Sequence, residues 1–187
     1  MTKLNAAYMG YRNREAGAVF EDLIQTALGW YEAKGIAKVE KTPEPMRPLS
    51  KPNGRGQFLA CFTKQAQADY TGTMRDGRSV RFEAKQTDTE KVAYSRLTKT
   101  QQDDLDAHQK LGALCFVLLC FSIDRFYRIP WGIWKDMKKI FGHMHVTEAE
   151  ISNYRVPFDN GIIRIFGPAK VSSNENNSSI KSERTEK

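Results

Sequence analysis

The sequence predicts a mixed α/β domain built around a central sheet, and three patterns carry that prediction. Residues from Gly17 to about Ala33 repeat apolar side chains at helical spacing, which is typical of an amphipathic helix. The run Ala113–Phe121 is apolar without a break, as in a strand that is buried on both faces. Between them, residues 68–87 resemble two short strands joined by an Asp-Gly turn. This alternation of helices and strands indicates a sheet with helices packed against it.

Length and charge narrow the class of protein. The 187 residues predict one domain over residues 1–170, followed by a polar tail over 171–187 that we expect to be disordered. The chain carries 29 Lys and Arg against 22 Asp and Glu, a formal net charge of +7. Such an excess favours polyanionic partners, either nucleic acid or an anionic membrane surface.

The compartment follows from what the sequence lacks. The N-terminus has no apolar signal core, and the longest apolar run, Leu111–Ile123, is too short to span a bilayer. The three cysteines show no metal-type spacing, and their odd number favours a reducing compartment. We therefore expect a cytoplasmic protein without a membrane partner, whether nucleoid-associated or phage-encoded in a host cytoplasm.

The segment Thr42–Gly56 interrupts the regular elements. It holds four prolines and cannot be a helix or a central strand. It is either a floppy loop or a projecting arm, which we place at about residues 42–60. Its cations Arg47, Lys51 and Arg55 suit contacts with phosphate groups.

Further elements complete the sheet. Leu97, Gln101 and Leu105 recur at helical spacing, and Gly112 ends that helix. After the buried strand, the pattern predicts another strand and a short helix that begins near Pro130. The motif GIIRIFG, residues 161–167, reads as an edge strand.

The second strand of the hairpin alternates charged and apolar side chains. Because strand side chains alternate between faces, Glu83 and Lys85 project together, away from Val80 and Phe82. The turn decides where Asp69 points. A two-residue turn places Asp69 opposite Ala84, facing the core. A three-residue turn that ends at a left-handed Gly77 places it opposite Glu83.

Two facing carboxylates repel each other unless a cation lies between them. Mg²⁺ binds a few carboxylates and keeps several waters, and there it could activate water beside a phosphate. Lys85 adds a compact positive charge that stabilises the reacting phosphate. An Asp followed by Glu-x-Lys on the next strand is the pattern of PD-(D/E)xK nucleases. Glu-x-Lys alone is common on solvated strand faces, so the weight lies on the combination.

Five sequence blocks then point to one family. They are GAVFE in the first helix, ADYTG and FEAKQT in the hairpin, LTKTQQDDL in the next helix and LGALCFVLLCF in the buried strand. In order and spacing, the chain resembles the RecU family of Holliday junction resolvases from Gly17 to Tyr127. The resemblance implies a restriction-endonuclease-like fold with a projecting stalk, a homodimer, dependence on Mg²⁺ (or Mn²⁺), and paired nicking of four-way DNA junctions during recombination and repair.

The resemblance also assigns residues. The acid before the hairpin falls on Asp69, the metal-binding glutamate on Glu83 and the transition-state lysine on Lys85. The helix glutamine, a further metal ligand, falls on Gln101, with Gln102 ranked second because its register breaks the match after Gly112.

Two positions are matched less closely. Glu21 matches a glutamate of the first helix and would support the site. The family carries a threonine two places before its aspartate, whereas this chain has Gln67, whose side-chain or backbone carbonyl is the candidate fourth ligand. The spacing from Asp69 to Glu83 is also one residue longer than in the family.

Two other functions stay open on the sequence. One is a nuclease for a different DNA form, duplex or flap. The other is a catalytically inactive protein that binds junctions without cutting, although the complete Asp69, Glu83 and Lys85 set counts against it.

Overall fold

The computed structural model describes residues 3–63 and 67–167, and for residues 3–14 it describes the backbone alone. The predicted tail 171–187 lies outside these residues. The helices are α1 (Lys3–Ala33), α2 (Lys99–Lys110), α3 (Trp131–Lys135), α4 (Met137–Phe141) and the 3₁₀ turns η1 (Tyr94–Arg96) and η2 (Ser152–Tyr154). The strands are β1 (Ala37–Lys41), β2 (Met46–Pro48), β3 (Ala60–Phe62), β4 (Tyr70–Met74), β5 (Ser79–Thr87), β6 (Lys91–Ala93), β7 (Leu114–Phe121), β8 (Arg125–Pro130), β9 (His145–Thr147), β10 (Arg155–Val156), β11 (Phe158–Asp159) and β12 (Ile162–Ile163).

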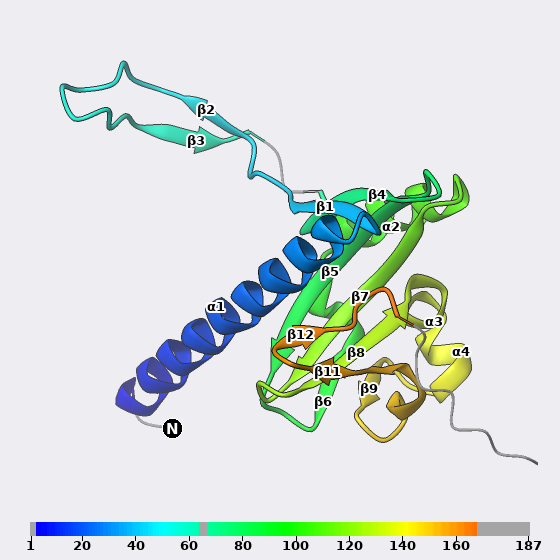
Figure 1. The fold of residues 1–187 in the computed structure, drawn as a ribbon. Coiled ribbons are helices and arrows are strands. Elements are labelled where there is room, and N and C mark those ends of the chain that lie inside the picture. The colour runs from blue at the N-terminus through cyan, green and yellow to red at the C-terminus, as the bar shows by residue number, and fades with distance from the viewer. Residues whose placement is uncertain (1–2, 64–66, 168–187) are drawn as a thin grey trace, which may run out of the picture.

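A mixed sheet of six strands forms the centre, in the order β1-β4-β5-β7-β8-β10. Strands β5 and β7 are parallel, and the other neighbours are antiparallel. The parallel pair follows from the α2 crossover, because two parallel neighbours need a long connection. Helices flank the sheet and an arm projects from it (Figure 1). This is a mixed α/β fold with a central sheet flanked by helices and a projecting arm, as the sequence predicted.

Each face of the sheet has its own apolar core. On one face α1 packs Phe20 and Ile24 against Phe82 and Phe116. On the other face Leu105 and the two tryptophans of α3 pack against Val117 and its neighbours. Strand β7 contributes alternate residues to the two cores, so all its residues after Leu114 are buried. The prediction of a strand covered on both faces is confirmed.

Helix α1 begins earlier than the sequence pattern indicates. The pattern placed its start at Gly17, whereas the helix begins at Lys3. Among the residues whose side chains are described, the buried apolar face of α1 begins at Phe20, and periodicity detects this part, which packs on the sheet. Helix propagation is cooperative, so the backbone of α1 is helical through the residues before this face as well. In the described ranges 3–63 and 67–167, no helix combines the length and apolarity needed to cross a membrane.

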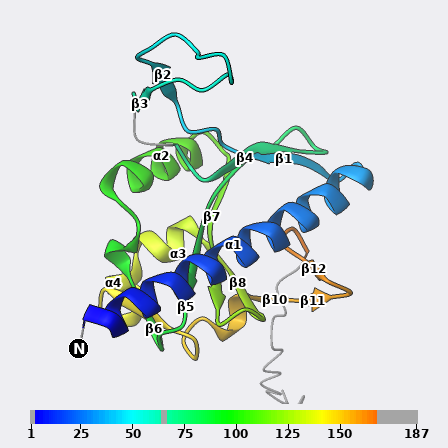
Figure 2. The same cartoon turned by 90° about the vertical axis from the view of Figure 1, so that its left-hand side faces the viewer.

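The proline-rich segment forms a projecting arm. Strands β2 and β3 pair antiparallel, and Figures 1 and 2 show this hairpin extending away from the domain. Its tip is closed by the Asn53 amide, which accepts from Arg55 N at 2.9 Å and from Gln57 N at 3.0 Å. Of the two conformations that the sequence left open, loop or arm, the structure adopts the arm.

The predicted edge strand at residues 161–167 is confirmed in part. The motif at 161–167 contributes only Ile162–Ile163, which pairs with β11 in a separate two-stranded hairpin. The central sheet instead ends at β10, which pairs with β8. Ile163 and Ile165 are drawn into the core beneath α1, so their apolarity reflects burial and not membership of the central sheet.

Candidate active site

The turn between β4 and β5 settles the register of the hairpin. Met74 N donates to Arg78 O at 2.8 Å, so the loop has three residues, and Gly77 takes a φ of 84°. Tyr70 pairs with Phe82, which places the preceding residue, Asp69, opposite Glu83. Of the two turns considered from the sequence, the structure has the one that brings the two carboxylates together.

Lys85 holds this carboxylate pair. Its Nζ atom lies 2.7 Å from Glu83 Oε2 and 2.9 Å from Asp69 Oδ2. The same Asp69 oxygen accepts from Ala84 N at 3.0 Å, which ties the acid to the edge of β5. The Glu83 side chain is fully buried, whereas Lys85 and Asp69 are 18% and 28% exposed. The site therefore opens to solvent on the Asp69 side.

Helix α2 delivers Gln101 to the same place. Its N-cap is Thr98, whose hydroxyl accepts from Gln101 N, while Gln101 Oε1 accepts from Thr98 N at 3.0 Å. This capping box fixes the side chain at the start of the helix. Gln101 Nε2 then donates to Glu83 Oε2 at 2.5 Å. The neighbouring Gln102 instead bonds Tyr94 and Leu97, so only Gln101 reaches the carboxylates.

Burial dominates the electrostatics of the site. Desolvation raises the pKa of Glu83 to about 7, against the stabilising charge of Lys85 and together with repulsion from Asp69. For Lys85 burial acts in the opposite direction, but the two carboxylates outweigh it and raise the pKa of the ammonium group. Lys85 therefore stays charged at neutral pH.

The oxygens present fit a hard divalent cation. Glu83 Oε1 is buried without a hydrogen-bond donor, which is costly for a carboxylate unless a cation neutralises it. No group of three or more acids, histidines or cysteines suited to a metal occurs within residues 3–63 and 67–167. A two-carboxylate site suits Mg²⁺, which keeps several waters. In this structure the Gln101 oxygen faces Thr98, so this side chain orients Glu83 instead of offering a ligand.

Two predicted residues lie outside this cluster. Glu21 bonds Lys41 Nζ at 2.5 Å and is 51% exposed, so it is turned toward the end of β1. Gln67 is exposed, and within the described residues it has no hydrogen bond to the cluster. That Glu21 or Gln67 assists a metal stays a prediction.

Sequence reasoning missed one part of the site. Asp104 Oδ2, one turn after Gln101 in α2, pairs with Arg81 Nη1 at 3.3 Å and accepts from Ala68 N at 3.4 Å. Asp104 thereby links the helix to both segments that carry the acids. The available signal was its position three residues after Gln101, on the same helix face.

The arm presents its cations to solvent. Arg47, Lys51 and Arg55 are all exposed. Exposed apolar side chains, which the sequence analysis did not single out, accompany them: Met46, Leu49, Phe58, Leu59 and Phe62. At the base of the arm, Thr42 N donates to Asp69 O at 2.9 Å, and the arm is therefore attached directly beside the site.

Comparison with known proteins identifies the class and then the family. The model of the family described as recombination protein U, RecU, matches residues 15–163. The Holliday junction resolvase RecU of Streptococcus gordonii is 28% identical over 134 residues, 68% of this chain and 66% of that protein. The one of Ligilactobacillus salivarius is 27% identical over 172 residues, 81% and 78% of the two chains.

Among solved structures, Hjc, a Holliday junction resolvase from Archaeoglobus fulgidus, matches with a TM-score of 0.45 and 10% identity, over 71% of this chain and 91% of that one. The alignment with the Streptococcus gordonii protein covers about two thirds of that protein's length. The class that the acid–lysine site and the family match define is that of the recombination proteins described as recombination protein U. The chain belongs to the RecU family.

Proposed function

We propose that this protein is a Mg²⁺-dependent endodeoxyribonuclease that resolves four-way DNA junctions by paired nicks, acting as a homodimer in a cytoplasm during recombination and repair. The observation that carries the proposal is the buried Glu83 carboxylate, held beside Asp69 by Lys85 in a chain of the RecU family. Its named relatives are Holliday junction resolvases.

Each site residue has a part in this chemistry. Asp69 and Glu83 would hold the ion, and Mg²⁺ when bound there lowers the pKa of a water and neutralises phosphate charge. Lys85, already charged and fixed between the two acids, is positioned to stabilise negative charge that develops on the phosphate. Gln101 holds Glu83 in place by its amide hydrogen bond. Mn²⁺ offers the same hard-ligand chemistry.

The substrate follows from charge, shape and symmetry. Phosphate contacts dominate the affinity of DNA-binding proteins, and a net charge of +7 supports them. A four-way junction presents opposed strands, which two copies of one site related by two-fold symmetry can cut as a pair. The arm, with its exposed cations and apolar side chains, would reach the branch point and select shape over sequence.

The decisive test is cleavage of an end-labelled four-way junction beside matched linear duplex and flap DNA, with Mg²⁺ and with a chelator. Symmetric nicks on the junction, lost with chelator and in Asp69→Asn, are expected. Equal cutting of duplex or flap would leave a nuclease without junction selectivity. Tight junction binding with no cut under any metal would identify a binding protein. Sedimentation of the same samples reports whether the protein is a dimer.

A further inference from the structure

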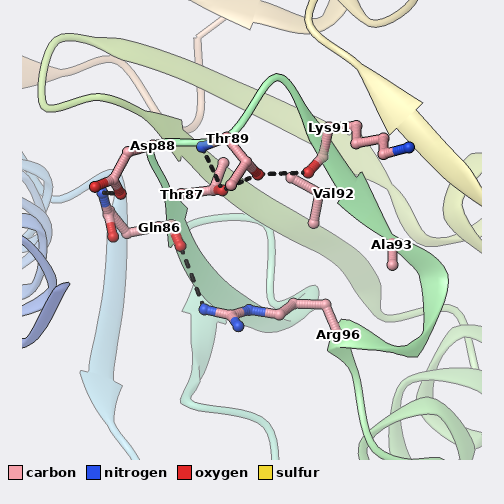
Figure 3. Close-up of a pocket in the computed structure, with 8 residues that line it drawn as sticks. All are labelled: Gln86, Thr87, Asp88, Thr89, Lys91, Val92, Ala93 and Arg96. Carbon is pink, nitrogen blue, oxygen red and sulfur yellow. Dashed lines mark hydrogen bonds between the residues drawn. The ribbon is translucent and has the colours of Figure 1, made fainter. Parts of the chain in front are cut away.

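A pocket of about 360 Å³ lies directly beyond the catalytic strand segment. Its lining comes from the end of β5, the following turn, β6 and η1: Gln86, Thr87, Asp88, Thr89, Lys91, Val92, Ala93 and Arg96 (Figure 3). Since Gln86 immediately follows Lys85, the pocket begins one residue from the centre described above. None of these residues has a part in the chemistry proposed so far.

Most polar groups of the pocket are already paired. The Thr87 and Thr89 hydroxyls bond each other at 2.8 Å, and Thr89 Oγ1 also donates to Lys91 O at 2.8 Å. The Asp88 carboxylate accepts from Gln86 Nε2 at 2.9 Å, and Figure 3 shows both side chains turned away from Arg96. These bonds stiffen the turn, and they leave two cationic groups in the pocket with unused donors, the Lys91 ammonium and the Arg96 guanidinium.

Of these two, the Arg96 guanidinium is the one that contacts the strand carrying Glu83 and Lys85. Its one hydrogen bond, from Nη2 to Gln86 O, is long at 3.4 Å, and no carboxylate of the described residues forms an ion pair with it. A guanidinium has five N–H donors in a planar fork that matches a phosphate. The chain around it is anchored, because Leu97 is buried and the Tyr94 hydroxyl donates to Gln102 at 2.9 Å. An exposed arginine held on a fixed backbone is suited to bind an anion.

The strand geometry relates Arg96 to the carboxylates. Thr87 O accepts from Ser122 N on the β7 side of β5, so Gln86 and Ala84 present their backbone groups to the opposite edge. Strand β4 pairs only as far as Phe82, and the free edge beyond it is occupied by side chains. Asp69 bonds Ala84 N there, and Arg96 bonds Gln86 O two residues further along. Two strand residues span about 7 Å.

We propose that Arg96 binds the phosphate next to the scissile one on the cleaved strand, in the pocket at the end of β5. Its contact and that of Asp69 lie two residues apart on β5, so a phosphate bound by Arg96 would lie beside one held at the carboxylates. The free N–H groups of the fork would bind this phosphodiester equally in the ground state and in the transition state, and so would strengthen DNA binding without changing the chemical step. This inference rests on the proposed nuclease function.

The test combines variants with neutral phosphates. Arg96→Ala and Arg96→Gln are compared with Arg78→Ala, which removes another exposed arginine whose side chain bonds a backbone carbonyl, Gly112 O at 3.2 Å, at the far end of β5. Junctions carry one methylphosphonate at a time near the cut. We expect Arg96→Ala to raise KM about 10-fold with kcat nearly unchanged, the loss of one bond to a charged group. Replacing the phosphate that Arg96 contacts by a methylphosphonate should raise the KM of the wild type by a similar factor. The same replacement should leave the KM of Arg96→Ala unchanged.

Binding gives a second, independent measurement. Junction affinity without metal should fall about 10-fold in Arg96→Ala, and the salt dependence should lose roughly one phosphate contact. A fall in kcat with KM and affinity unchanged would show that Arg96 only supports the turn, and so would overturn the proposal. An equal effect of Arg78→Ala would also overturn it. So would a methylphosphonate series in which every neutral phosphate that weakens the wild type weakens Arg96→Ala by the same factor. If wild type cuts nothing, the nuclease proposal fails, while the methylphosphonate binding series still decides the Arg96 contact.

Discussion

The Asp104 carboxylate of α2 lies 3.3 Å from the Arg81 guanidinium of β5 in a largely buried position. The same oxygen accepts from Ala68 N, the residue before Asp69. One side chain thus joins the helix that carries Gln101, the strand that carries Glu83 and the segment that carries Asp69. Since Arg81 Nε has no partner of its own, the pair depends on this single carboxylate to compensate a buried cation.

Asp104→Ala should therefore destabilise the protein by about 2–4 kcal/mol, because it leaves the buried Arg81 charge unpaired. The matched control is Asp103→Ala, which removes an acid that is 62% exposed and whose one ion pair within the described residues is with Lys99, and it should cost less than about 0.5 kcal/mol. Urea unfolding of the two variants measures the difference. Equal midpoints would show that the Arg81–Asp104 pair has no structural role.

Lys85→Met should slow cleavage by about 10²–10³-fold and spare binding. The ammonium group is held between both carboxylates, and loss of one preorganised charge of this kind costs about 10²–10³ in rate. The control Lys99→Met removes a lysine that is 82% exposed on α2. Single-turnover cleavage and band-shift affinity are measured together. A variant that cuts normally would remove Lys85 from the chemistry.

Gln101→Ala should slow cleavage, whereas Gln102→Ala should not. Gln101 donates to Glu83 and closes the capping box, so its loss frees the carboxylate and also costs about 1 kcal/mol of stability. Gln102 bonds only Tyr94 and Leu97 in the described structure. Cleavage rates compared well below the melting temperatures separate the two effects. Equal rates in both variants would contradict the assignment of Gln101.

The metal-free protein should lose stability as pH rises toward neutrality. Burial raises the pKa of Glu83 from 4.5 to about 7, so between these values the folded protein keeps a proton that the unfolded chain releases. The contribution is present below pH 4.5 and declines until about pH 7, by on the order of 3 kcal/mol. Glu83→Gln should flatten this decline. Urea unfolding of both proteins in chelator from pH 5 to 8 measures this decline. If the stability of the wild type and that of Glu83→Gln vary with pH in parallel, Glu83 is not the cause.

The exposed cations of the arm predict a salt-dependent contact with DNA phosphates. Replacing Arg47, Lys51 and Arg55 by alanine should weaken junction binding and lower the salt slope by roughly three. The control replaces Lys34, Lys138 and Lys139, which are equally exposed and leave the same net charge. Band shifts across a salt series measure both. Identical losses in the two triple variants would mean that the arm contributes charge without a specific contact.

The sequence alone determined the features that depend on local spacing. Residues two apart on a strand share a face, so Glu83 and Lys85 had to project together. Gly77 favoured the three-residue turn that the structure confirms, because a left-handed residue suits glycine. The proline-rich segment had to leave the sheet, since proline cannot donate in a ladder. The α/β order and the family resemblance followed from such patterns, whereas the arm was one of two conformations that they allowed.

Only the tertiary structure decided which distant side chains meet and how deeply they are buried. Glu83 loses all exposure because β7 and α2 close over β5, and this packing raises its pKa. Glu21 turns to Lys41, which no helical period could have shown. Gln101 aims its nitrogen at Glu83 because the capping box takes its oxygen. Each of these contacts joins segments well separated along the chain or depends on the packing around it, so it exists only once the sheet and helices have assembled.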